Sequence, residues 1–91
     1  PMQNAGVNLM AGSDCGAYNS FVYPGESLHS ELKHLVMAGL SPQQALITSF
    51  INGPKFFNLQ EHYGSVSSGK VADLILLDKN PLENIENLSS I

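Results

Sequence analysis

The hydrophobic pattern of the first part of the chain predicts a buried strand followed by an amphipathic helix. Residues 5–16 are an apolar run ending in a turn of small residues that carries Asp14, which is typical of a buried strand. Its core-forming side chains are Val7, Leu9 and Met10. Between Ser27, the predicted helix cap, and about Ala38, apolar residues recur on one helical face, and Gly39 supplies the stop. This face consists of Leu28, Leu32, Leu35 and Val36.

A second helix is predicted from its start signal. Ser41, Pro42 and Gln44 have the spacing of a capping box with proline at the first helical position. The helix is expected to run to about Asn52 and to bury one apolar face. That face consists of Ala45, Leu46, Ile47, Phe50 and Ile51. A further helical turn at residues 55–59 is expected to add its large apolar side chains to the same core.

The remaining chain has the residue pattern of strands. Residues 64–66 and 71–78 predict two strands of a hairpin, joined by residues 67–70 with Gly69 in the left-handed position. The apolar run within the second strand needs cover on both faces, which requires more chain than these residues supply. The fold is therefore expected to be a piece of something larger or to dimerise. Residues recurring at intervals of three predict a terminal helical turn: Leu82, Ile85, Leu88 and Ile91.

The segment between the first strand and the first helix, residues 17–26, reads as an irregular loop. It contains Tyr18, Phe21 and Tyr23 together with turn-forming residues. A long aromatic loop beyond a strand often lines a pocket, and the same side chains can simply pack the loop down. Both interpretations stay open at this point.

Composition restricts the class of protein. The chain has 91 residues, of which 43% are hydrophobic and 13% charged, which fits one small packed domain and excludes a disordered segment or a membrane span. A net charge of −4 with four scattered lysines excludes nucleic acid as a partner. The single cysteine cannot form an internal disulfide and no secretory signal is present, so a cytoplasmic location is expected.

Asp14 is the candidate for chemistry, because α/β enzymes place catalytic groups at the carboxyl ends of buried strands. The structural alternative is an Asx-turn or a helix cap. His29 is expected to be half-buried on its helix and His34 solvated, and each is more typical of a structural residue than of a metal ligand. A thiol enzyme using Cys15 with His29 or His34 is a third hypothesis, disfavoured because the neighbouring carboxylate opposes formation of the thiolate.

The order of several short motifs resembles a known family. These motifs are Ala11-Gly12-Ser13-Asp14, Ser27 to Leu32, Ala38 to Leu46, Gly64-Ser65-Val66, Gly69 to Leu74, and Asp78 to Leu82. Together they resemble the carboxyl-terminal part of a metal-dependent amidohydrolase, with most similarity to the imidazolonepropionase and prolidase-like branch. The resemblance covers essentially the whole chain.

The resemblance implies an α/β fold, namely the carboxyl-terminal fragment of a (β/α)8 TIM barrel with a β-hairpin of an accessory β-sandwich. Residues 1–62 would be the last barrel strand and the following helices, and residues 63–91 the carboxyl-terminal strands of the sandwich and a tail. Asp14 would bind a catalytic divalent metal, usually zinc, and take a proton from the metal-bound water. The implied activity is hydrolysis of carbon–nitrogen bonds in a small-molecule substrate: a non-peptide or cyclic amide, or a dipeptide.

The other metal ligands of that family have no counterpart here, because His29, His34 and His62 do not occur at family positions. Catalytic zinc usually takes three protein ligands, so the chain alone is expected to be inactive and to hold no metal. Its expected partners are a missing amino-terminal part of the barrel or a second copy. The competing hypothesis is a stand-alone structural module that self-associates through exposed strand edges, without catalysis.

Overall fold

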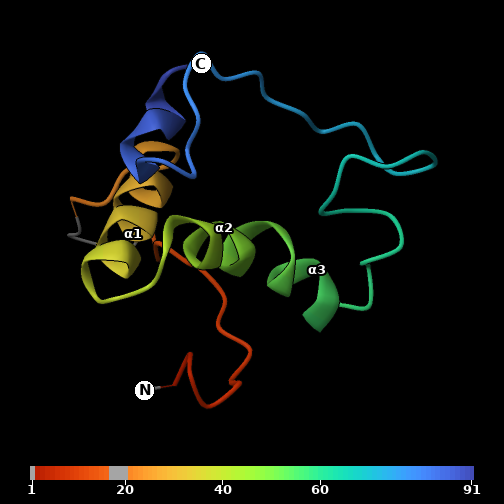
Figure 1. The fold of residues 1–91 in the computed structure, drawn as a ribbon, viewed down its shortest axis with the longest axis horizontal. Helices are drawn as coiled ribbons and strands as arrows, with labels where there is room; N and C mark the ends of the chain where they lie inside the picture. Colours follow the sequence, from red (N-terminus) through yellow and green to blue (C-terminus); the bar gives the residue numbers. More distant parts are fainter. Residues whose placement is uncertain (1, 17–20) are drawn as a thin grey trace.

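The computed structural model describes residues 2–16 and 21–91 of the chain. Figure 1 shows α1 beside a carboxyl-terminal 3-10 helix, η1, and α2 leading from α1 to α3. A long irregular segment connects α3 to η1. The helices are α1 (Glu26–Met37), α2 (Pro42–Phe50), α3 (Asn52–Phe56) and η1 (Ile85–Ser89). In the described part of the chain, no helix combines the length and apolar character needed to cross a membrane.

The core lies where α1, α2 and η1 meet. Leu32 of α1 is only 1% exposed and packs with Ala45 of α2 and with Ile85 and Leu88 of η1. The predicted apolar face of α1 is confirmed, since its other three members pack against this cluster. The predicted terminal helical turn is confirmed for its two inner residues, because the 3-10 helix places Ile85 and Leu88, three residues apart, on one buried face, whereas Leu82 and Ile91 lie outside it and are exposed.

The start of α1 differs from the prediction. The helix begins at Glu26 with Gly25 as its N-cap, and no side chain caps it. Gly25 adopts φ 85, a left-handed conformation that suits glycine at this sharp entry into the helix. Ser27 therefore lies inside the first turn, and its buried hydroxyl has no hydrogen-bond partner among the described residues. The predicted Ser27 cap is wrong because the chain turns two residues earlier.

The start of α2 is as predicted, and its buried face is confirmed only in part, since Ala45 is buried and Leu46 packs against the core while Ile51 is exposed. The Ser41 hydroxyl accepts from the Gln44 backbone N–H at 3.1 Å, and the Gln44 side chain accepts from the Ser41 N–H at 2.9 Å. Thr48 is buried and its hydroxyl donates to the Ala45 carbonyl, whereas Phe50, predicted to be buried, is exposed. Only the side of α2 that faces the core is covered, so its apolar face is wider than its buried face.

Removing the cap of α2 is expected to destabilise the domain measurably. The Ser41→Ala variant leaves the Gln44 N–H without its acceptor and is expected to lose about 0.5–2 kcal/mol of unfolding free energy. Urea denaturation followed by circular dichroism measures this loss. The control is Ser67→Ala, which removes an exposed serine in an irregular segment and is expected to stay within about 0.5 kcal/mol of the parent. Equal losses in the two variants would contradict the assignment of the cap.

The predicted α/β fold, with a last barrel strand and a β-hairpin, is wrong for the described residues. Residues 2–16 and 21–91 contain helices, turns and irregular chain, and no strand. Residues 5–16 were expected to be a buried strand, but Val7 and Met10 are exposed. Residues 64–66 and 71–78 do not pair as a hairpin. A strand needs a neighbouring strand for its backbone hydrogen bonds, and the described chain supplies none.

Two glycines of the irregular segment after α3 have definite roles. Gly69 adopts φ 86 within a turn closed by the Lys70 N–H to Ser67 carbonyl bond, so its predicted left-handed position is confirmed. Gly64 adopts φ 98 where the chain passes the end of α2, and a Cβ there would lie 2.5 Å from the Phe50 carbonyl oxygen. This close approach admits no side chain at Gly64 without a backbone shift.

The aromatic side chains outside the core are mostly exposed. Tyr18 lies outside the described residues, and both Phe21 and Tyr23 are exposed, so these two do not pack the loop down. The expected anchoring of the turn after α2 is also wrong. Phe56 and Phe57 pack edge to face with each other, with ring centroids 5.1 Å apart, but both remain largely exposed.

Candidate functional site

Asp14 lies in an irregular turn that presents it to solvent. The residue is exposed and adopts φ 51, in the left-handed region. Among non-glycine residues, Asp and Asn adopt this conformation most readily because their short polar side chains bond locally. The conformation of Asp14 is therefore compatible with a role in forming the turn and with a role in chemistry. The catalytic and metal-binding role of Asp14 stays a prediction.

Two hydrogen bonds hold the segment that leads to Asp14 against α2 and the first residue of α3. The Ala11 N–H donates to the Thr48 carbonyl at 3.1 Å, and the Asn52 side-chain amide donates to the Leu9 carbonyl at 2.7 Å. Sequence reasoning treated Asn52 only as part of a helix stop. No local pattern signals this bond, because its partners are 43 residues apart. The attachment places Asp14 just beyond a fixed point on the helical core.

The three histidines do not gather around Asp14. His29 is half-buried on α1, and its Nδ1 lies 3.4 Å from the Ser89 hydroxyl of η1. His34 is exposed, as predicted, and His62 is exposed in the turn after α3. Within residues 2–16 and 21–91, no three His, Cys, Asp or Glu side chains come close enough to hold a metal ion. The described residues therefore do not fit a catalytic zinc by themselves, since such a metal takes three protein ligands.

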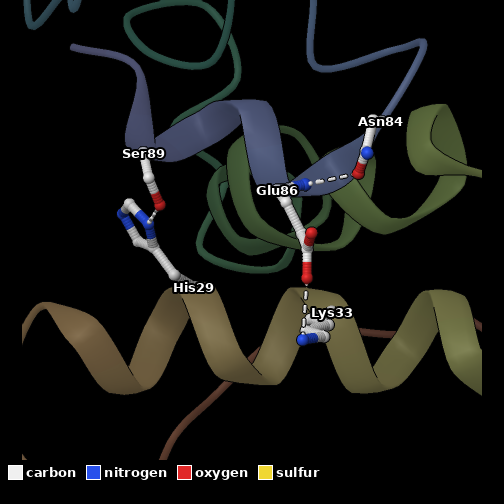
Figure 2. A network of polar contacts seen from close by, with 5 residues as sticks. All are labelled: His29, Lys33, Asn84, Glu86 and Ser89. Atoms are coloured by element: carbon white, nitrogen blue, oxygen red, sulfur yellow. Dashed lines mark hydrogen bonds and ion pairs between the residues drawn. The ribbon is translucent and has the colours of Figure 1, made fainter.

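A network of polar contacts joins α1 and η1 (Figure 2). Lys33 Nζ lies 2.7 Å from Glu86 Oε1, and both side chains are more than half exposed. The hydrogen bond from Lys33, and then its charge, lower the pKa of the Glu86 carboxyl. The Asn84 side chain caps η1 by accepting from the Glu86 N–H at 3.0 Å. These contacts fasten η1 to α1, and exposed ion pairs of this kind stabilise a protein only slightly.

The described residues form at least two surface clefts, and Asp14 lines neither of these two. The smaller, of about 250 Å³, is the polar notch between α1 and η1 that contains His29 and Lys33. The larger, of about 410 Å³, lies between the α2–α3 junction and the irregular segment after α3, and most of its lining is apolar. The candidate carboxylate and the clefts are thus separate features of this chain.

The thiol hypothesis gains no support from the geometry. Cys15 is an exposed free cysteine. The His29 ring faces Ser89 on η1, and His34 is exposed near the end of α1. A nucleophilic cysteine needs a base within hydrogen-bond reach, and the described residues give Cys15 none.

The sequence of this chain is similar to those of known proteins. The sequence profile described as "Amidohydrolase family" matches residues 1–90. The chain is 34% identical over 71 residues to an adenine deaminase of Desulforamulus reducens, covering 78% of this chain and 12% of that protein. It is 31% identical over 83 residues to a 5-methylthioadenosine/S-adenosylhomocysteine deaminase of Teredinibacter turnerae, covering 86% of this chain and 19% of that protein. No solved structure matches the chain.

Proposed function

Because this chain belongs to the amidohydrolase family, we propose that it is part of an enzyme that hydrolyses a carbon–nitrogen bond. The observation that carries the proposal is the family match over residues 1–90. The chain spans 12% and 19% of the lengths of the two relatives, so the activity is assigned to a complete polypeptide that includes these residues. Residues 1–62 and 63–91 are proposed to belong to two structural parts of it, and its location is proposed to be cytoplasmic.

The relatives favour an amino group as the group removed. Both are named as deaminases, one of adenine and the other of adenosine derivatives. We therefore take the small-molecule substrate to be a purine that carries an exocyclic amino group. The imidazolonepropionase and prolidase-like branch is not confirmed by these relatives, and cleavage of a cyclic amide or dipeptide rests on the sequence resemblance alone.

Asp14 is the residue proposed to move protons in this reaction. A water oxygen bonds to the ring carbon, and the amino group departs as ammonia. A carboxylate beside the reacting atoms can accept the proton of the attacking water and return it to the departing nitrogen. Two observations support this role: Asp14 is exposed, and it makes no hydrogen bond with the described residues.

The family is generally metal-dependent, and a divalent metal would supply a water that loses its proton near neutral pH. The described residues do not bring Asp14 together with two further His, Cys, Asp or Glu side chains, so they do not fit that metal alone. We propose that further ligands, and zinc as the metal, belong to the complete polypeptide. The alternative of a non-catalytic self-associating module predicts neither metal nor turnover in any version of the protein.

The test is ammonia release from adenine and from 5-methylthioadenosine. The complete polypeptide, purified with zinc, is expected to release ammonia from at least one of them, and the 91-residue chain from neither. Elemental analysis of the 91-residue chain after dialysis is expected to find well under one zinc per chain, because one carboxylate does not hold zinc. A complete polypeptide without activity on both compounds would contradict the proposed substrate class. Stoichiometric zinc in the short chain would contradict its proposed incompleteness.

A further inference from the structure

The segment between Val71 and Asp78 has no backbone hydrogen-bond partner among the described residues. The Val71 N–H donates to the His62 carbonyl at 2.8 Å, and the Asp78 N–H donates to the Ser90 carbonyl at 2.8 Å. Between these fixed ends, no N–H or carbonyl of residues 72–77 bonds to residues 2–16 or 21–91. Figure 1 shows this part of the chain as a long open trace along the edge of the molecule. Both of its edges are open to another backbone.

The same segment is the most apolar exposed run of the described chain. Leu74 and Ile75 are exposed, and Leu76 is 87% exposed. Successive side chains of an extended segment point to opposite faces, so both faces would carry uncovered leucine or isoleucine. An apolar run with open backbone edges is a template for pairing with another strand.

We propose that residues 70–78 pair with the same residues of a second copy as a two-stranded antiparallel ladder centred on Leu74. This inference concerns the 91-residue chain and does not depend on the proposed function. The occupant is a second copy because the segment is complementary to itself in charge. Lys70 and Asp78 are equally far from Leu74, on opposite sides of it, so each lysine faces an aspartate of the other chain.

Symmetry restricts the register. A two-fold axis perpendicular to an antiparallel ladder keeps each side chain on its face, so the axis must pass midway between one residue and its copy. Centring on Leu74 pairs Ala72 with Leu76 between the two Lys70–Asp78 pairs. Centring on Asp73 instead places like charges opposite each other, which is destabilising.

Two neighbouring centres are less suitable. Centring on Ile75 places Asp78 opposite Ala72, without a cation. Centring on Leu76 also pairs charge with charge at both ends, Asp73 with Lys79, but it brings Asp78, whose N–H already bonds to the Ser90 carbonyl, inside the ladder opposite Leu74. The Leu74 centre places Asp73 opposite Ile75, but it pairs charge with charge at both ends and keeps the pairs nearest its centre among residues 72–76, whose backbone is open.

The first test is the association of the 91-residue chain measured by sedimentation equilibrium over a range of concentrations. The parent is expected to be a dimer that dissociates on dilution. The Leu76→Lys variant is expected to weaken the dimer by at least about tenfold, because two leucines per dimer lose their cover. The control is Ile91→Lys, at an apolar residue 75% exposed outside the segment, which is expected to leave the dimer within about twofold of the parent.

The second test is a charge exchange. Lys70→Asp and Asp78→Lys are each expected to weaken the dimer by about fivefold, because each puts like charges opposite at both ends of the ladder. The combined variant is expected to return to within about twofold of the parent. Lys70 also donates a hydrogen bond to the Gln60 carbonyl, at 2.8 Å, and the combined variant cannot make this bond. If the combined variant regains dimer affinity, the gain therefore comes from the restored charge pairs. Lys79→Asp makes the same charge change beyond the ladder and is the control.

The third test reads the register directly. In a Cys15→Ser background, Leu74→Cys places two thiols opposite each other, within reach of a disulfide, and is expected to cross-link the dimer in oxidised glutathione. Ile75→Cys places its thiols on a diagonal, about 7–8 Å apart, and is expected not to cross-link. A monomer at every concentration, or cross-linking of Ile75→Cys in preference to Leu74→Cys, would overturn the proposal. If the 91-residue chain is a monomer, the open backbone of residues 72–77 would be available to residues outside these 91.

Discussion

The Leu32→Ala variant of the 91-residue chain is expected to lose about 2–5 kcal/mol of unfolding free energy. Leu32 is the largest fully buried side chain among the described residues, and it contacts both α2 and η1, so its removal leaves a cavity at the centre of the core. A domain this small is stable by only about 5 kcal/mol or little more. The variant is therefore expected to be largely unfolded at 37 °C.

Urea denaturation followed by circular dichroism, at one protein concentration for all variants, measures this loss. Leu82→Ala is the matched control, because Leu82 is 52% exposed and the same methyl groups leave no cavity there. Its loss is expected to stay below about 0.5 kcal/mol. If the two variants lost equal stability, the packing of η1 and α2 on Leu32 would not be the source of the stability of the domain.

The Asp14→Asn variant of the complete polypeptide is expected to reduce kcat for ammonia release by about 10²–10⁴-fold. An amide cannot accept the proton of the attacking water, so the reaction loses its base. Asn is the suitable replacement because it tolerates the left-handed φ of 51 at this position, whereas Ala would add backbone strain. The fold and the turn are expected to stay intact.

Steady-state kinetics and thermal unfolding of the same preparation separate the two effects. The variant is expected to unfold within about 1 °C of the parent, a shift that corresponds to a small fraction of a kcal/mol. Glu83→Gln, which also replaces an exposed carboxylate by an amide, is the control and is expected to keep full activity. Full activity of Asp14→Asn would exclude Asp14 from the chemistry and leave it a turn residue.

Local patterns predicted the helical part of this protein well. The capping box of Ser41 and Gln44 and the apolar face around Leu32 occur as expected, because both depend on residues within one or two turns of each other. The left-handed Gly69 is also local. The motif order that suggested an amidohydrolase agrees with the family match over residues 1–90.

The strand predictions failed for a physical reason. A helix satisfies its backbone within itself, whereas a strand needs a partner that its own residues cannot specify. Residues 5–16 and 71–78 have the composition of buried strands, but the described chain offers them no adjacent strand, and both remain irregular. The prediction that residues 71–78 need cover from elsewhere is consistent with the exposure of Leu76.

The candidate site shows the same division. The sequence by itself determined the helices, the turn that carries Asp14 and the family, because each depends on neighbouring residues or on their order. Only the tertiary structure decided that Asn52 holds the segment before Asp14, that Thr48 is buried and that η1 completes the core. These depend on contacts between residues far apart in the chain, such as the 43-residue separation of Leu9 and Asn52, and no local spacing records such contacts.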